Sequence, residues 1–252
     1  MRIFRVELSI FGQIAIQRPI SFNFQKELDF GSVFQSDIKI IQHAKGVKIS
    51  STVNTADQER AYKVALLFVG KMLDVLALKT NTALVVSNID LRLAEENNAV
   101  RAIIDEDEFR CSFLLPQTLN LHETTFFKGL NWYRKGLYTE DPFDRFLAFW
   151  NSISIVAGKY HTPDDRTRAG IINQIWSCFT LLWGDNNNWN FVNGDDRWIN
   201  LNNDIRTNIA HALIPVEIQH VEDLINKLDT LQKVAYSFLT QWANKRLNQP
   251  LL

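Results

Sequence analysis

The chain has 252 residues, 46% hydrophobic and 12% aromatic, which is enough apolar surface for one large domain or two small ones. Its formal net charge is −1 and its pI about 6.5, which excludes a strongly basic protein with a global field for nucleic acid. Any RNA binding must therefore be local or come from two facing subunits.

The first part of the chain, up to about residue 117, is patterned as β-structure. Apolar residues alternate loosely over residues 3–10, and a second apolar run over 14–24 is broken by Pro19, which suits an edge strand or a bend. Residues 47–53 are a third expected strand. The sequence therefore predicts a β-rich domain over residues 1–118.

One helix is expected inside this domain, because apolar residues recur at helical spacing over 61–76 after a capping Thr55 or Asp57. Polar turns at 95–98 and 105–108 are expected to be solvated tips rather than metal sites. These turns separate further strands, predicted as an antiparallel meander over residues 84–93, 99–104 and 109–115.

From residue 119 onward the pattern is helical, which makes the expected fold α+β with a helical domain over 119–252. Asp141 and Pro142 are typical of a helix cap and first turn. A polar, Asn-rich loop is expected over 184–197. The amphipathic helices are predicted over residues 121–138, 143–156, from Asp164 or Asp165 to 183, 201–213 and 217–246.

The cysteines and the hydropathy of the sequence predict where in the cell the protein is found. Cys111 and Cys178 lie far apart, outside any Cys-x-x-Cys or zinc spacing, and both are expected to be buried thiols in a reducing cytoplasm. The first residues contain no apolar run typical of a signal peptide, and no stretch is typical of a membrane span. We therefore expect a cytoplasmic protein with no membrane association, no metal and no cofactor.

One short segment, Arg206-Thr-Asn-Ile-Ala-His211, contains two side chains that can act together on a phosphate group. Histidine can take or give a proton near neutral pH, and arginine holds a phosphate through a planar fork of donors. In a chain with 14 Arg and 5 His, about one such spacing is expected by chance. The surrounding sequence must therefore support the assignment.

Two segments resemble the HEPN superfamily, and within it the Apea-like branch. In residues 127–151, Tyr133-Arg-Lys-Gly136 is followed by Asp141-Pro-Phe143 and a hydrophobic helix. Residues 204–213 have the family pattern of Arg, four to six residues and His, directly before the final helix. The resemblance covers residues 121–247. It departs from the catalytic members in one place. The residue after the arginine, often Asn or another polar residue in those members, is Thr207 here, and Asn follows one place later as Asn208.

This resemblance implies a metal-independent endoribonuclease of the toxin or phage-defence kind, acting as a homodimer that joins two motifs in one cleft. His211 would be the acid or base that handles the RNA 2′-OH proton, and Arg206 would stabilise the charged phosphorane. Asp204, Thr207 and Asn208 would bind RNA or support the pair. The implied partners are RNA, a second copy, and an antitoxin or effector protein.

Two alternatives stay open from the residues alone. The chain could be a non-catalytic module that binds RNA, a nucleotide or a protein, or a purely structural accessory subunit. Arg206 could pair with Asp204, and His211 could cap backbone groups. The Asn-rich loop offers Trp189 and Phe191 as ligand contacts. The remaining histidines are expected to be ordinary surface or capping residues: His43, His122, His161 and His220.

Overall fold

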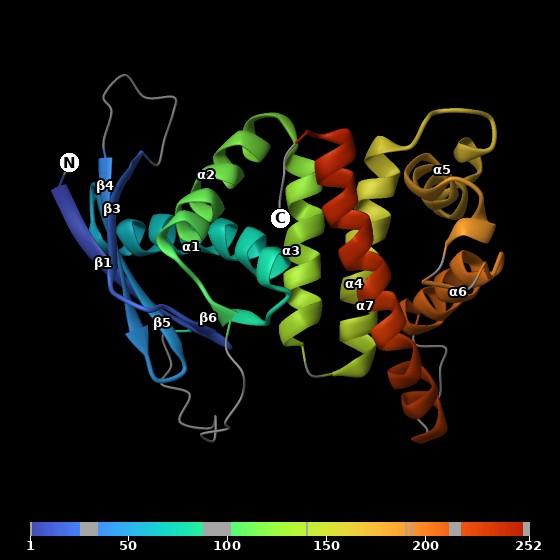
Figure 1. Cartoon of the computed structure of the whole chain (residues 1–252), viewed down its shortest axis with the longest axis horizontal. Helices are drawn as coiled ribbons and strands as arrows, with labels where there is room; N and C mark the ends of the chain where they lie inside the picture. The colour runs from blue at the N-terminus through green and yellow to red at the C-terminus, as the bar shows by residue number, and fades with distance from the viewer. Residues whose placement is uncertain are drawn as a thin grey trace. The chain divides into compact units, whose positions relative to one another are not determined.

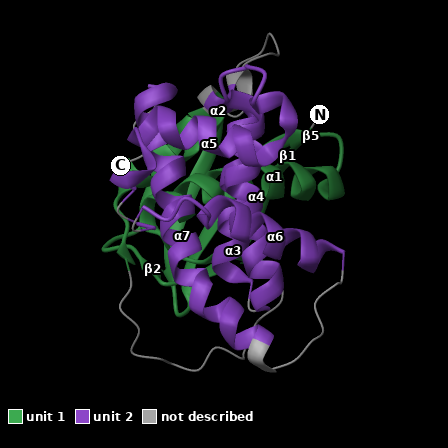
Figure 2. Ribbon diagram, turned by 90° about the vertical axis from the view of Figure 1, so that its right-hand side faces the viewer, with its two compact units in different colours: residues 1–117 green, residues 118–252 purple. Residues whose placement is uncertain are grey.

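The protein has an α+β fold, in which an antiparallel sheet of N-terminal strands is followed by a helical region. The chain divides into two compact units, residues 1–117 and 118–252 (Figure 2). Within its described part, every helix is too short or too polar to span a lipid bilayer. The computed structural model describes residues 2–25, 35–87, 102–139, 141–189, 191–192, 194–211 and 218–248.

The first unit is built on a five-stranded sheet of order β3-β4-β5-β1-β6 (Figure 1). β1 and β5 form its longest pair, with Leu8 opposite Ile49 and Ile10 opposite Val47. These alternate side chains are buried and form the core side of the sheet. The strands are β1 (Arg2–Gly12), β3 (Ile20–Gln25), β4 (Gln35–His43), β5 (Gly46–Thr55) and β6 (Leu84–Ser87), beside a small parallel pair, β2 (Ile14–Ala15) and β7 (Ala102–Ile103).

Strand β4 is absent from the sequence prediction. Its inward positions are Ser36, Ile38 and Ile40, so one core position is polar. The Ser36 hydroxyl is satisfied by donating to the Thr52 carbonyl at 2.6 Å, which makes its burial tolerable. Because a serine occupies one of the three core positions, the alternation of apolar and polar residues that identifies a strand is incomplete in β4.

Helix α1 (Gln58–Thr80) follows β5 as expected. Its cap is Asp57 rather than Thr55, because the Asp57 carboxylate accepts the Arg60 backbone N–H at 2.8 Å. Of the predicted meander, β6 ends at Ser87 and pairs antiparallel with β1, as part of the main sheet. β7 covers Ala102–Ile103 and pairs parallel with β2 in a separate sheet, so the prediction of an antiparallel strand there is wrong. Residues 88–93 and 99–101 of the two predicted strands, and the polar turn at 95–98, lie outside the described residues.

The strand predicted over 109–115 is wrong, because these residues belong to helix α2 (Glu106–His122). The acidic segment is a helix start rather than a turn: the Asp105 carboxylate accepts the Glu108 N–H at 2.8 Å, and acids in the first turn suit the helix dipole. Phe109 and Phe113, one turn apart, are buried. The first unit therefore contains more helix than α1.

The two cysteines differ in environment. Cys111, on α2, is exposed, so the expectation that it is buried is wrong. Cys178 is buried, and burial raises the pKa of its thiol to about 12. Cys178 is therefore a neutral core residue.

The second unit is a set of packed helices. Asp141 caps α4 by accepting the Asp144 N–H at 2.9 Å, with Pro142 in the first turn, as predicted. α3 and α4 approach closely at Gly136, where an added Cβ would lie 2.7 Å from the Phe149 ring. The helices are α3 (Thr124–Tyr138), α4 (Pro142–Tyr160), α5 (Ile171–Trp183), α6 (Trp198–Ala210) and α7 (Ile218–Arg246).

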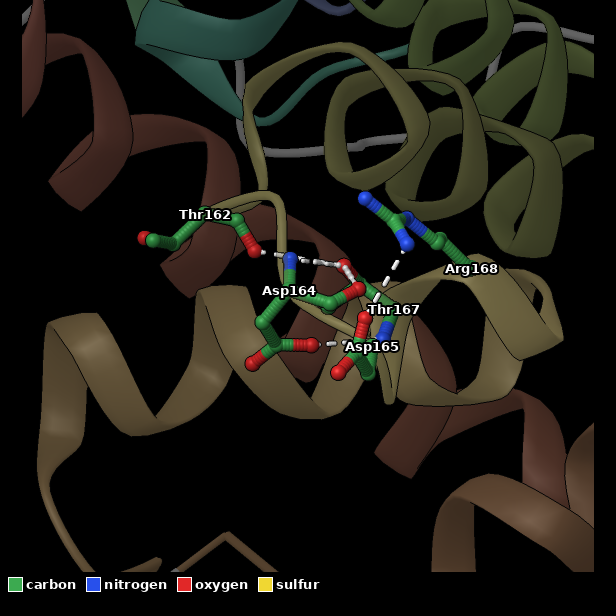
Figure 3. A network of polar contacts seen from close by, with 5 residues as sticks. All are labelled: Thr162, Asp164, Asp165, Thr167 and Arg168. Atoms are coloured by element: carbon green, nitrogen blue, oxygen red, sulfur yellow. Dashed lines mark hydrogen bonds and ion pairs between the residues drawn. The ribbon is translucent and has the colours of Figure 1, made fainter.

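Helix α5 begins at Ile171, later than predicted, because the acidic segment before it forms a closed turn (Figure 3). The Asp164 carboxylate accepts the Thr167 N–H at 2.7 Å, and the Thr167 hydroxyl accepts the Asp164 N–H at 2.9 Å. The backbone donor of Thr167 lowers the pKa of the Asp164 carboxyl. Gly170, at φ 124°, then separates this turn from α5.

Candidate functional site

The first half of α6 is fixed in the core of the helical unit. Trp198, Ile199 and Asn202 are buried, and the Asn202 amide donates to the Trp198 carbonyl at 2.7 Å. The Trp198 ring lies 6.1 Å from that of Trp150 on α4 and 6.4 Å from that of Phe179 on α5. The helix starts three residues earlier than predicted, and these contacts set its direction.

The second half of α6 carries the predicted site residues and emerges from the core. No described residue from 203 to 211 is buried. Arg206 and Thr207 are half-exposed, and the exposed residues are Asp204, Asn208, Ala210 and His211. The structure therefore places every predicted site residue where solvent or a ligand can reach it.

His211 is the residue that ends α6. Its backbone N–H donates to the Thr207 carbonyl at 3.0 Å, and its φ of −102° and ψ of 10° take the chain out of the helix. The imidazole is thus held at a helix terminus by a fixed backbone. Residues 212–213, the last two of the predicted helix, lie outside the described residues.

Arg206 and His211 do not stack on one another within a single copy. Five residues correspond to roughly 140° around a helix and about 7.5 Å along it. Asn208 lies three residues before His211 and shares its side of the helix, whereas Asp204 and Arg206, two residues apart, point in different directions. One copy therefore presents its cation and its imidazole on different sides of α6.

Both side chains are available for a ligand. Among the described residues, no side chain forms a hydrogen bond or an ion pair with Arg206 or His211. The alternative pairing of Arg206 with Asp204 is not formed in this structure. A guanidinium and an imidazole with unused donors can hold and protonate phosphate oxygens.

The loop before α6 is held by an aromatic cluster. Trp189 is fully buried, and its ring lies 4.7 Å from that of Trp176 and 5.3 Å from that of Phe179. Its indole N–H donates to the Gly184 carbonyl at 3.1 Å. The Trp189 ring is inaccessible to a ligand in this structure, so the hypothesis that it contacts one is wrong. Phe191 stays half-exposed beside it.

Two other histidines have local structural roles. The His43 ring nitrogen accepts the Lys45 N–H at 3.4 Å, and the ring packs edge-on against Phe11. His161 ends α4, with its Nδ1 3.1 Å from the Ala157 carbonyl. The side chain of His122 lies outside the described residues, and His220 is half-exposed on α7.

No protein-family model, curated protein or solved structure matches this chain. Across the described ranges, no three His, Cys, Asp or Glu side chains are grouped closely enough to hold a metal ion. The chemistry available at α6 is therefore argued from the arginine and histidine that it carries.

Proposed function

We propose that the helical unit is a HEPN-type RNA-cleaving module in which Arg206 and His211 act on one phosphate, and that the chain serves as a toxin or phage-defence effector. The observation that supports the chemistry most is the availability of both side chains on the outward half of α6, with no described partner. The resemblance of residues 127–151 and 204–213 to the Apea-like branch supports the reaction class.

The proposed reaction is an internal transesterification. A His211 imidazole takes the proton from the RNA 2′-OH, whose oxygen attacks the adjacent phosphorus. The bond from phosphorus to the 5′-oxygen breaks, and a protonated imidazole gives that oxygen its proton. Arg206 holds the charged oxygens of the phosphorane. The products are a 2′,3′-cyclic phosphate and a 5′-hydroxyl.

The site is proposed to be shared by two copies of the chain, because one copy places Arg206 and His211 on different sides of α6. A second copy would supply the missing group and double the positive charge on a protein of net charge −1. Leu201 on α6 and Ile225 on α7 are 44% and 50% exposed. Burial of such exposed apolar side chains against a second copy would favour self-association of the helical unit.

The function predicts cleavage of single-stranded RNA in the presence of EDTA, with DNA of the same sequence left intact, because the proposed step needs a 2′-OH and no metal. Gel analysis of labelled oligonucleotides with and without chelator checks this. Cleavage that EDTA abolishes and magnesium restores would contradict the proposed chemistry.

The shared site also predicts a homodimer. Light scattering at micromolar concentration should give about twice the chain mass of 29.2 kDa. Replacing Ile225 with aspartate should shift the protein toward monomer and lower cleavage, whereas the same change at the exposed Leu67 of the first unit should alter neither. A strict monomer with full activity would rule out the shared site.

The geometry also favours a second candidate, a non-catalytic module that binds RNA, a nucleotide or a protein. It follows from the same separation of Arg206 and His211, because a monomer with this arrangement could hold a phosphate through Arg206 but not cut it. In that case Arg206→Ala weakens binding, His211→Ala has little effect, and the wild-type chain shows no cleavage.

A further inference from the structure

Helix α3 concentrates positive charge. It carries Lys128, Arg134 and Lys135 and contains no aspartate or glutamate from Thr124 to Tyr138. The helical unit as a whole is close to neutral, as the chain is. The charged side chains of this helix are therefore all positive, which favours the approach of anions.

The exposed side of α3 joins these charges to an aromatic ring. Lys128, Trp132 and Lys135 follow helical spacing, at i, i+4 and i+7, and so lie on one side. Lys128 is exposed, and Trp132 and Lys135 are half-exposed. The opposite side packs Phe126 and Leu130 into the core. Trp132 is thus kept at the surface, between two lysines about 10.5 Å apart along the axis.

Two of the cations on α3 lie against aromatic rings of the same helix. The Lys135 ammonium is 5.0 Å from the Trp132 ring centre, and the Arg134 guanidinium is 5.8 Å from that of Tyr138. Among the described residues, no carboxylate forms an ion pair with Lys128 or Lys135. The charges of these two lysines are therefore not neutralised by an ion pair within the described residues, and Lys135 and the half-exposed Trp132 ring form a cation–π pair at the surface.

We propose that Lys128, Trp132 and Lys135 form a docking strip for single-stranded RNA. The Trp132 ring stacks on a base, and the two lysines neutralise phosphates on either side of it. Charge complementarity and a half-exposed aromatic ring, rather than an apolar groove, favour a single-stranded nucleic acid over a protein. The choice of RNA rests on the function proposed above.

The strip is separate from the Arg206 and His211 pair. α3 and α6 lie on either side of the α4 and α7 helices within the helical unit (Figure 1). Holding RNA on α3 and cutting it at α6 are therefore two events, which different substitutions should affect independently.

The test measures binding of a fluorescent single-stranded RNA to His211→Ala protein, which leaves the probe uncut. Trp132→Ala should weaken binding by about 5- to 100-fold, and Trp132→Phe should restore most of it. The Lys128→Gln/Lys135→Gln double variant should reduce the slope of log K against log salt by about 1.4. The matched control, Lys227→Gln/Lys233→Gln, removes two exposed charges from α7 and should change neither value.

The outcomes separate the strip from the proposed function. If wild-type protein binds RNA through the strip but never cleaves it, the strip stands and the nuclease proposal fails. If RNA is cleaved while the α3 variants bind with unchanged affinity and salt slope, the strip is overturned. Absence of RNA binding by the wild-type chain also overturns it. Thermal unfolding of each variant, with Trp132→Phe as the conservative change, excludes misfolding as the cause.

Discussion

Replacing His211 with alanine is expected to slow RNA cleavage by about 10²- to 10⁴-fold, because the variant lacks the group that moves the 2′-OH proton. Arg206→Ala should cause a loss of similar size by removing the charge that stabilises the phosphorane. Neither side chain is buried, and neither has a described partner, so the free energy of unfolding should change by about 1 kcal/mol or less. Single-turnover rates and melting temperatures, measured on the same preparations, check both statements.

Two control variants test whether a loss of cleavage is specific to Arg206 and His211. His43→Ala removes an imidazole from the first unit, and Arg246→Ala removes an exposed guanidinium from the end of α7; both should cleave RNA at the wild-type rate. Unchanged cleavage by His211→Ala would overturn its catalytic role. Unfolding of both motif variants would show instead that the pair is structural.

Replacing Trp189 with alanine is expected to lower the free energy of unfolding by about 3–5 kcal/mol, the cost of emptying a large aromatic site in a core. Trp189 is fully buried against Trp176 and Phe179, and Phe179 in turn contacts Trp198 at the start of α6. The melting temperature should fall by roughly 10 °C or more. Cleavage should fall too, because the motif helix loses part of its support.

The comparison for this change is Trp132→Ala, which removes the same side chain from a half-exposed position. Its effect on the melting temperature should be clearly smaller, since less surface leaves the core. Equal destabilisation by the two changes would contradict the view that the aromatic cluster anchors the loop and α6.

Local sequence patterns were sufficient to predict those elements that depend on short-range interactions. The caps at Asp57 and Asp141, and the long amphipathic helix up to Arg246, are all confirmed, because a carboxylate meeting a backbone N–H and a repeated apolar stripe are short-range features. The α+β class follows from the change of period along the chain and is likewise confirmed.

The wrong or missing predictions have two causes. Some features depend on residues that are distant in the sequence, and some sequence patterns fit both a strand and a helix. Strand β4 buries Ser36 through a bond to Thr52, sixteen residues away. The segment around Phe109 and Phe113 has spacing that fits either a strand or a helix, and the capping Asp105 decides for the helix. The burial of Trp189 needs rings from α5, which no local pattern shows.

For the site, the sequence supplied the residue types and their helix, but not the residue at which α6 leaves the core. That Arg206 and His211 emerge from the core depends on where the buried residues of α6 stop, after Asn202. The strip proposed on α3 is not predicted from the sequence, because Trp132 also fits the apolar spacing of the helix expected over residues 121–138. A helix without carboxylates that interleaves lysines with an aromatic ring is the signal that would have found it.

The most direct test of the central claim is the chemistry of the RNA ends. Wild-type protein, incubated in EDTA with a labelled RNA, should leave 2′,3′-cyclic phosphate and 5′-hydroxyl termini. An otherwise identical RNA with 2′-deoxyribose at the cleaved position should stay intact at that bond, and His211→Ala should leave both RNAs intact. Cleavage at the deoxy position, or 3′-hydroxyl ends with 5′-phosphates, would contradict attack by the 2′-OH under the control of Arg206 and His211.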